Sequence, residues 1–98
     1  MTINKEKDAA ELRISLHGRL DTTTAPQLEE ELSKSLDGIS ELVFDFGALD
    51  YISSAGLRVL LSAQKTMNKQ GGMKIVNVSE TIMEIFEVTG FSEILNII

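Results

Sequence analysis

The apolar residues of this chain recur with two different periods, and the period changes several times along the sequence. Leu12, Ile14 and Leu16 alternate with polar residues, which is the pattern of a strand with one buried face. Leu28 and Leu32 are four residues apart, as on the buried stripe of a helix. Repeated changes of this kind predict the order β-β-α-β-α-β-α. Strands separated by helices pair in parallel through helical crossovers, so the chain is predicted to form an α/β fold with a mixed sheet of four to five strands.

The expected elements follow from where each pattern begins and stops. Strands are expected at residues 1–7, 12–17, 42–46 and 73–77, and helices are expected to start near Thr24, Ser54 and Ser79 and to stop before Gly38, Gly71 and Gly90. Residues 18–23 and 48–53 are expected to be loops, and residues 91–98 a terminal strand or a short helix. The run 42–46 is mostly apolar, so it is predicted to be a central strand covered on both faces.

The helix starts and the buried helix faces can also be assigned. Thr24 is expected to cap the first helix, with Gln27 reaching back and Pro26 in the first turn. Ser54 is favoured as the N-cap of the second helix. The side chains expected to face the core are Leu57, Leu60, Leu61, Gln64 and Met67 on the second helix, and Ile82, Ile85, Phe86 and Thr89 on the third.

Composition limits the functions open to the chain. Its 98 residues suffice for one core, so a single domain over residues 1–98 is expected. A formal net charge of −6, without a cluster of Lys or Arg, argues against binding to nucleic acid or to an anionic membrane. Because the chain has no Cys and one His, neither a metal nor a cofactor is expected.

No apolar run approaches the roughly 20 residues of a membrane helix, and the first residues lack the apolar core of a secretory signal. The absence of Cys is compatible with a reducing compartment. We therefore expect a cytoplasmic protein that is a monomer when free.

The sequence signatures of common catalysts are missing. The chain has no G-x-S-x-G elbow, no phosphate-binding P-loop and no dinucleotide fingerprint. Ser, His and Asp all occur, but His17 falls on the strand face opposite Leu12, and no spacing directs it at Ser54. The chain is therefore predicted not to be an enzyme and to have no catalytic residues.

Two polar segments, residues 18–24 and 50–57, are expected to meet at one end of the sheet, where partners of open α/β sheets gather. Ser54 stands at a helix start, where free N–H groups and the helix dipole partly accommodate a phosphate charge of about −1.5 to −2. Ser54 is thus a candidate for both a cap and a switch. The small residues Ala55 and Gly56 would either let a partner's backbone approach or pack the helix on the sheet.

Together, Gly18-Arg19-Leu20-Asp21 and Ser53-Ser54-Ala55-Gly56-Leu57 resemble the STAS domain of bacterial anti-sigma factor antagonists, and the resemblance covers essentially the whole chain. It implies a non-catalytic regulator of sigma-factor-dependent transcription. Such an antagonist binds an anti-sigma factor that is also a serine kinase, is released when that kinase phosphorylates it, and is restored by a PP2C-type phosphatase. The family's acceptor serine falls on Ser54 and its loop aspartate on Asp21.

The resemblance also implies a partner-binding surface, and one departure from the family pattern keeps alternatives open. The implied partner-binding residues are Asp21, Thr22, Thr23, Ser53, Ala55, Gly56 and Arg58. The family pattern often has an Asp directly before the acceptor, where this chain has Ser53. Ser53 is therefore a second candidate acceptor. The alternative function is a phosphorylation-independent STAS adaptor or scaffold, for example one associated with a transporter.

Overall fold

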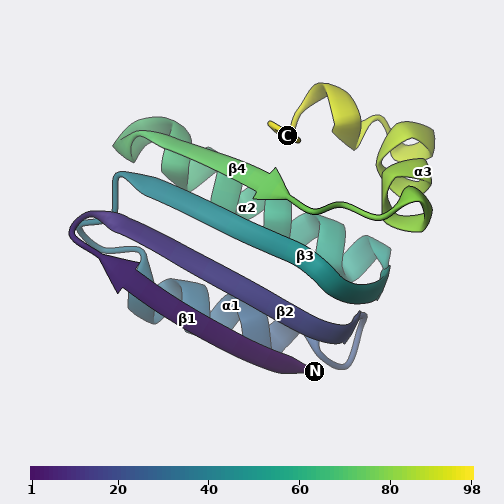
Figure 1. Cartoon of the computed structure of the whole chain (residues 1–98), viewed down its shortest axis with the longest axis horizontal. Coiled ribbons are helices and arrows are strands. Elements are labelled where there is room, and N and C mark those ends of the chain that lie inside the picture. The colour runs from purple at the N-terminus through teal and green to yellow at the C-terminus, as the bar shows by residue number, and fades with distance from the viewer.

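Four strands pair into one mixed sheet in the order β1-β2-β3-β4 (Figure 1). The computed structural model describes residues 1–98, and its strands are β1 (Thr2–Asp8), β2 (Glu11–Leu20), β3 (Glu41–Ile52) and β4 (Gly72–Val76). β1 runs antiparallel to β2, whereas β2, β3 and β4 are parallel to one another. The predicted α/β fold, its mixed sheet and its order of elements are therefore confirmed.

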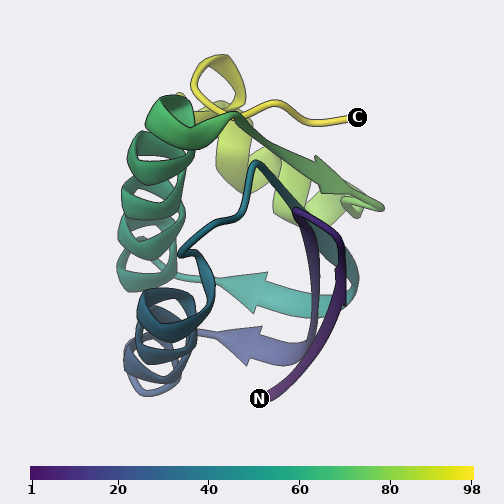
Figure 2. The ribbon, with the colours of Figure 1, turned by 90° about the vertical axis from the view of Figure 1, so that its left-hand side faces the viewer.

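Three helices complete the fold. The helices α1 (Ala25–Ser35) and α2 (Ser54–Gln70) lie side by side on one face of the sheet (Figure 2). Both belong to crossovers that advance in the same direction across the sheet, and crossovers of one hand then place their helices on the same face. The helix α3 (Glu80–Thr89) lies beyond the carboxyl ends of β3 and β4 and stops before Gly90, as predicted (Figure 1).

The face of the sheet opposite α1 and α2 carries no helix (Figure 2). The prediction that residues 42–46 are covered on both faces is therefore wrong. Val43 is nevertheless only 1% exposed on this open face. Its register partners are Arg13 on β2 and Lys74 on β4, and long side chains of this kind cover a neighbour with their methylene stems.

Side chains of β2 and β3 form the centre of the core between the sheet and the helices. Ile14, Leu16, Phe44 and Phe46 are fully buried there, so the predicted inner face of β2 is confirmed. Each contributes roughly 1.5–3 kcal/mol relative to an exposed side chain. The ring of Phe46 lies 6.4 Å from that of Phe86, between centroids, which anchors α3 to β3.

The predicted buried faces of the helices are largely correct. On α2, the buried predicted residues are Leu57, Leu60, Gln64 and Met67, and on α3 they are Ile82 and Phe86. Leu61 and Ile85 are half-buried. Thr89 is exposed, against the prediction, because its hydroxyl donates to the Ile85 carbonyl at 2.7 Å and so remains at the helix surface.

β2 and β3 are longer than the alternation predicted. β2 continues to Leu20, so the first half of the loop predicted at 18–23 is strand, and β3 continues to Ile52, so the loop predicted at 48–53 is strand except for Ser53. The register between the two strands shifts twice, and both shifts insert an extra residue into β3, where such bulges break the alternation of inward and outward side chains. Gly18 lies at the second shift with φ of 100°, a conformation that side-chain-bearing residues rarely adopt.

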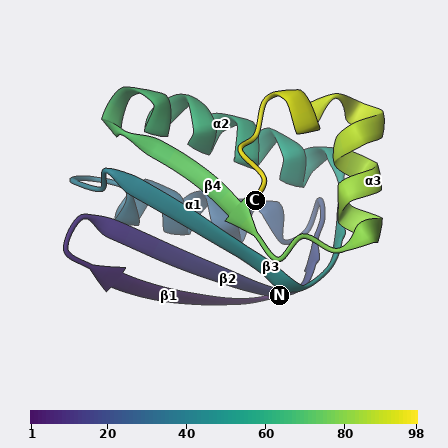
Figure 3. The ribbon, with the colours of Figure 1, turned by 45° about the horizontal axis from the view of Figure 1, so that its top comes forward.

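Residues 91–98 contain both of the predicted alternatives in part. Phe91–Glu93 form a short 3-10 helix, and Ile97 makes a single parallel bridge to Ile75 of β4. Two backbone hydrogen bonds to Ile75, of 2.9 and 3.0 Å, hold this tail in place. Figure 3 shows the tail beside β4, where it covers part of an otherwise unpaired strand edge.

The N-terminus lies at the end of the sheet where β2 and β3 finish (Figure 1). Because β1 is antiparallel to β2, Thr2 pairs with His17 near the carboxyl end of β2. A Cβ placed on Gly18 would lie 3.8 Å from the Met1 Cα. The first residues of the chain are therefore neighbours of the segment that follows β2.

Candidate functional site

The two polar segments meet at the carboxyl ends of β2 and β3. Leu20 pairs with Ile52 in the parallel register, and the Ser53 N–H donates to the Leu20 carbonyl at 2.9 Å. Asp21 and Ser54 are the residues that directly follow these two hydrogen-bonded positions. The prediction that both segments form one end of the molecule is therefore confirmed.

The side chain of Asp21 organises the segment between β2 and α1. Its Oδ1 accepts hydrogen bonds from the Thr23 N–H at 3.0 Å, from the Thr23 hydroxyl at 2.7 Å and from the Thr24 N–H at 3.2 Å. These bonds, that of the Thr23 hydroxyl foremost, hold the pKa of Asp21 below its usual 3.8. The carboxylate is therefore ionised and held in one orientation, with Thr22 and Thr23 exposed beside it.

Thr24 is the N-cap residue of α1, but it does not form the predicted capping box with Gln27. Its hydroxyl donates to the Arg19 carbonyl at 2.8 Å and accepts from the Asp21 N–H at 2.8 Å, and no cap hydrogen bond from its side chain is present. The hydroxyl is turned back toward the segment that precedes the helix. The sequence correctly placed the start of α1 but assigned the wrong bonds to this side chain.

The start of α2 was also predicted correctly, but its N-cap is Ser53 and not Ser54. Ser53 has an extended backbone, and its Oγ accepts a long hydrogen bond of 3.5 Å from the Gly56 N–H. Ser54 is the first helical residue, and its exposed side chain makes no hydrogen bond to the protein. Two adjacent serines have the same capping preference, so the sequence could not separate them. The Ser54 hydroxyl is consequently free.

Gly56 is buried and lets the first turn of α2 pack closely on the sheet. A Cβ at this position would lie 2.7 Å from Leu20 Cγ and 2.9 Å from Ile52 Cγ1, closer than atoms can pack. The first turn of α2 can therefore approach β2 and β3 this closely only with glycine here, which supports the packing role expected for Gly56, and its contact with a partner stays a prediction. Ala55 is half-buried against the core, whereas Arg58 is exposed.

The sequence reasoning missed Arg19 and Tyr51, which lie at the same end of the sheet. The Arg19 guanidinium carbon is 4.4 Å from the centroid of the Tyr51 ring, and its Nε is 3.6 Å from Asp21 Oδ2. Arg19 and Tyr51 are register partners one position before Leu20 and Ile52. Extending the two predicted strands by a few residues would have placed Arg19 next to Tyr51 in the parallel register.

His17 lies on the open face of the sheet, whereas Ser54 begins a helix on the covered face. The His17 Nε2 is 3.4 Å from the Asn4 Nδ2, and no hydrogen bond links His17 to Ser54. No group of three or more His, Asp or Glu side chains is placed to hold a metal ion.

Asp45 is the centre of a separate polar network on the open face. Its Oδ1 accepts from the Gly47 N–H and from the Asn77 side-chain amide, both at 3.0 Å, and its Oδ2 lies 3.2 Å from an Arg13 nitrogen. The Gly47 N–H, then the Asn77 amide and Arg13, hold the pKa of Asp45 below its usual 3.8. This network joins β2, β3 and the residue after β4.

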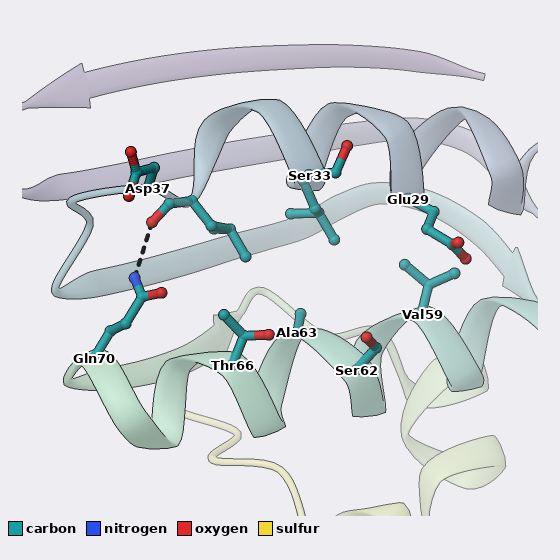
Figure 4. A pocket seen from close by; sticks show the side chains of 10 residues that line it. Glu29, Ser33, Asp37, Val59, Ser62, Ala63, Thr66 and Gln70 are labelled. Atoms are coloured by element: carbon teal, nitrogen blue, oxygen red, sulfur yellow. Dashed lines mark hydrogen bonds between the residues drawn. The ribbon is translucent and has the colours of Figure 1, made fainter.

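A groove of about 370 Å³ lies between α1 and α2 (Figure 4). Leu32, Leu36, Val59 and Ala63 provide its apolar lining. The side-chain amide of Gln70 closes one end by donating to the Leu36 carbonyl at 2.8 Å. None of the predicted site residues lines this groove, so it is separate from the surface at the carboxyl ends of β2 and β3. No helix of the protein combines the length and the apolar character needed to span a bilayer.

The segments that contain Asp21 and Ser54 lie in the part of the chain that matches the model of a known protein family. The model of the STAS domain matches residues 2–98. This chain belongs to the STAS domain family. The match spans the Asp21 and Ser54 segments of the STAS domain and all three of its helices.

Two relatives resemble this STAS domain along nearly its whole length. BtrV of Bordetella bronchiseptica, named as a candidate anti-sigma factor antagonist, is 38% identical over 96 residues, which cover 96% of this chain and 83% of BtrV. The anti-sigma-B factor antagonist of Bacillus subtilis is 28% identical over 98 residues, which cover 99% of this chain and 90% of that protein.

Solved structures share the same fold. The phosphorylated form of the Bacillus cell fate determinant SpoIIAA matches with a TM-score of 0.76 and 19% identity over 99% of this chain and 91% of that one. At this level of identity the likeness establishes the fold of the STAS domain.

Proposed function

We propose that this STAS domain is an anti-sigma factor antagonist, which binds an anti-sigma factor while Ser54 is unmodified and is released when Ser54 is phosphorylated. The observation that carries the proposal is the exposed, unbonded Ser54 hydroxyl at the first residue of α2, next to the hydrogen bond that ties Ser53 to Leu20. The names of BtrV and of the Bacillus subtilis relative support it. Through this cycle the protein regulates sigma-factor-dependent transcription.

A phosphate on Ser54 changes the charge of the surface while the fold stays intact. It adds about −1.5 to −2 charge at the start of α2, where free N–H groups and the helix dipole accommodate it. Ser54 is exposed, so the phosphate displaces no core side chain. A partner surface fitted to a neutral hydroxyl must then accommodate a dianion, and binding weakens.

In this proposal the STAS domain is a substrate and a binding protein rather than an enzyme. The anti-sigma factor acts as the serine kinase and transfers the terminal phosphoryl group of ATP to the Ser54 oxygen. A PP2C-type phosphatase hydrolyses the phosphate ester and restores the hydroxyl. We place this cycle in the cytoplasm, with the free STAS domain as a monomer.

The first prediction is that Ser54, and not Ser53, accepts the phosphate. Incubation with the cognate anti-sigma kinase and ATP should add one phosphoryl group, a mass increase of about 80 Da, as measured by intact-mass spectrometry and peptide mapping. Ser54→Ala should take up none. Ser53→Ala is the matched control and should still be modified, because the Ser53 oxygen caps α2 whereas the Ser54 hydroxyl is free.

Binding measurements separate the switch from the adaptor function. Ser54→Glu should weaken binding to the anti-sigma factor, whereas Ser54→Ala should preserve it. The phosphorylation-independent adaptor remains an alternative because Ser53 stands where the family pattern often has Asp. Undiminished binding by Ser54→Glu, together with no phosphate uptake by the wild-type protein, would refute the switch and favour the adaptor.

A further inference from the structure

The Arg19 side chain is held on two sides and open on a third. Its guanidinium lies over the Tyr51 ring, 4.4 Å from the centroid, and its Nε is 3.6 Å from Asp21 Oδ2. The side chain is still 60% exposed, and its two terminal nitrogens donate no hydrogen bond within the protein. Four N–H donors of a planar cation are therefore free at the surface.

The groups that hold Arg19 are themselves fixed. Asp21 Oδ1 receives the hydrogen bonds of Thr23 and Thr24, which leaves Oδ2 to face the guanidinium. Tyr51 is half-buried in β3 and pairs with Arg19 across the parallel ladder. A long arginine side chain ordinarily loses rotamer freedom when it binds a partner. Because the Arg19 side chain is already restricted in the free protein, the entropy cost of binding through it is smaller.

We propose that Arg19 is a partner-binding residue whose terminal nitrogens receive a carboxylate side chain of the anti-sigma factor. The inference rests on the proposed function, and it names a contact outside the serine switch. A guanidinium edge fits the two oxygens of a carboxylate with two parallel hydrogen bonds. A carboxylate also supplies the charge opposite to that of Arg19, whose terminal nitrogens donate no hydrogen bond within the protein. Arginine and tyrosine are also the residue types over-represented among interface hot spots.

Tyr51 acts in this arrangement as a positioning residue. Its ring keeps the guanidinium in place without contacting the partner's carboxylate, so its effect must pass through Arg19. Tyr51→Leu should weaken binding in the wild-type background and should have little further effect in the Arg19→Ala background. This non-additivity is a readout that a purely structural role of Tyr51 would not produce.

The test measures binding of the unphosphorylated protein to its cognate anti-sigma factor by surface plasmon resonance. Arg19→Ala should bind about 10- to 100-fold more weakly, mainly through faster dissociation, because it removes a desolvated hydrogen-bonded contact. Arg19→Lys keeps the charge but loses the planar pair of donors, so its affinity should be intermediate. Lys65→Ala is the matched control: Lys65 is exposed on α2, forms no ion pair and carries the same charge. Its affinity should stay within about two-fold of wild type.

Three results would overturn the inference, and they can be told apart. If Arg19→Ala binds as wild type while Ser54→Glu does not, the switch stands and the Arg19 contact is refuted. If Lys65→Ala weakens binding as much as Arg19→Ala, the effect is one of net charge and the specific contact is refuted. If the wild-type protein binds no anti-sigma factor, the proposed function fails and the Arg19 contact fails with it. Thermal melting of each variant confirms that folded proteins are compared.

Discussion

Ser53, Ser54 and Gly56 lie within four positions of one another and have three different tasks. Ser53 caps α2, Ser54 presents a free hydroxyl, and Gly56 lets the helix approach β2 and β3. None of these tasks is interchangeable, because each depends on one backbone position in the first turn. Ser54, the proposed phosphate acceptor, is therefore placed by the packing and capping of its neighbours.

Gly56→Ala should destabilise the protein although alanine favours helices. The new Cβ would lie 2.7 Å from Leu20 Cγ, and overpacking of this kind costs about 1–3 kcal/mol. The better helix propensity of alanine offsets this by up to about 1 kcal/mol. Thermal denaturation should show a lower Tm for Gly56→Ala than for wild type. The exposed-site variant Lys65→Ala should melt close to wild type, and a Gly56→Ala protein as stable as wild type would contradict the close packing.

At the scale of elements, α2 connects the core to Ser54. Its buried stripe packs on the sheet while its first residue remains exposed. The stripe fixes the orientation of the whole helix, and the orientation fixes where Ser54 is displayed. Changes deep in the helix interface should therefore affect folding first, and the display of Ser54 only through folding.

Leu60→Ala and Leu61→Ala compare the same substitution on two sides of α2. Leu60 is fully buried, so its truncation should lower the free energy of unfolding by about 2–5 kcal/mol. Leu61 is half-buried, and its truncation should cost clearly less. Urea denaturation measures both changes. Equal losses for the two variants would show that the helix is rotated from the orientation described above.

The sequence predicted the buried faces of the helices better than the ends of the strands, because the strand ends contain register shifts. The spacing of apolar residues on α2 and α3 reports directly on burial, so all but the half-buried Leu61 and Ile85 and the exposed Thr89 were placed in the core correctly. Along β2, Gly18 interrupts the run of alternating apolar side chains, although the strand continues to the buried Leu20, and along β3 the two register shifts break the alternation after Phe46. Sequence reasoning therefore found the Asp21 and Ser54 segments but missed the pairing of Arg19 and Tyr51, which only the continued ladder creates.

At the scale of the whole molecule, the sheet has one face covered by helices and one polar open face. On the open face, the network of Asp45 with Arg13 and Asn77 joins β2, β3 and the chain after β4. Because this network crosses most of the sheet, its loss should affect global unfolding rather than local fraying. None of the hydrogen-bond partners of Asp45 belongs to the serine segment 53–56, so binding and acid stability should be separable.

The acid sensitivity of the protein should depend on Asp45. Its pKa is held below 3.8 in the folded state, so its ionised form stabilises the fold fully above that value. The stabilisation is lost as the pH falls below this value and through the folded pKa. Asp45→Asn cannot titrate, so the stability difference between wild type and variant should be constant near neutral pH and should shrink as the pH falls from about 4 through the folded pKa. Urea denaturation across this range tests it, and a difference independent of pH would contradict the assignment.

The antiparallel pairing of β1 with β2 also governs how this protein can be handled and labelled. Because Thr2 pairs with His17, anything joined ahead of Met1 would emerge beside the segment that follows β2. An N-terminal affinity tag or fused domain would therefore crowd the proposed partner-binding surface around Asp21 and Ser54. The turn that leads into β3, around Gly38, lies at the other end of the sheet and is exposed. A fluorophore or surface linker attached at that turn would leave the surface at the carboxyl ends of β2 and β3 unobstructed.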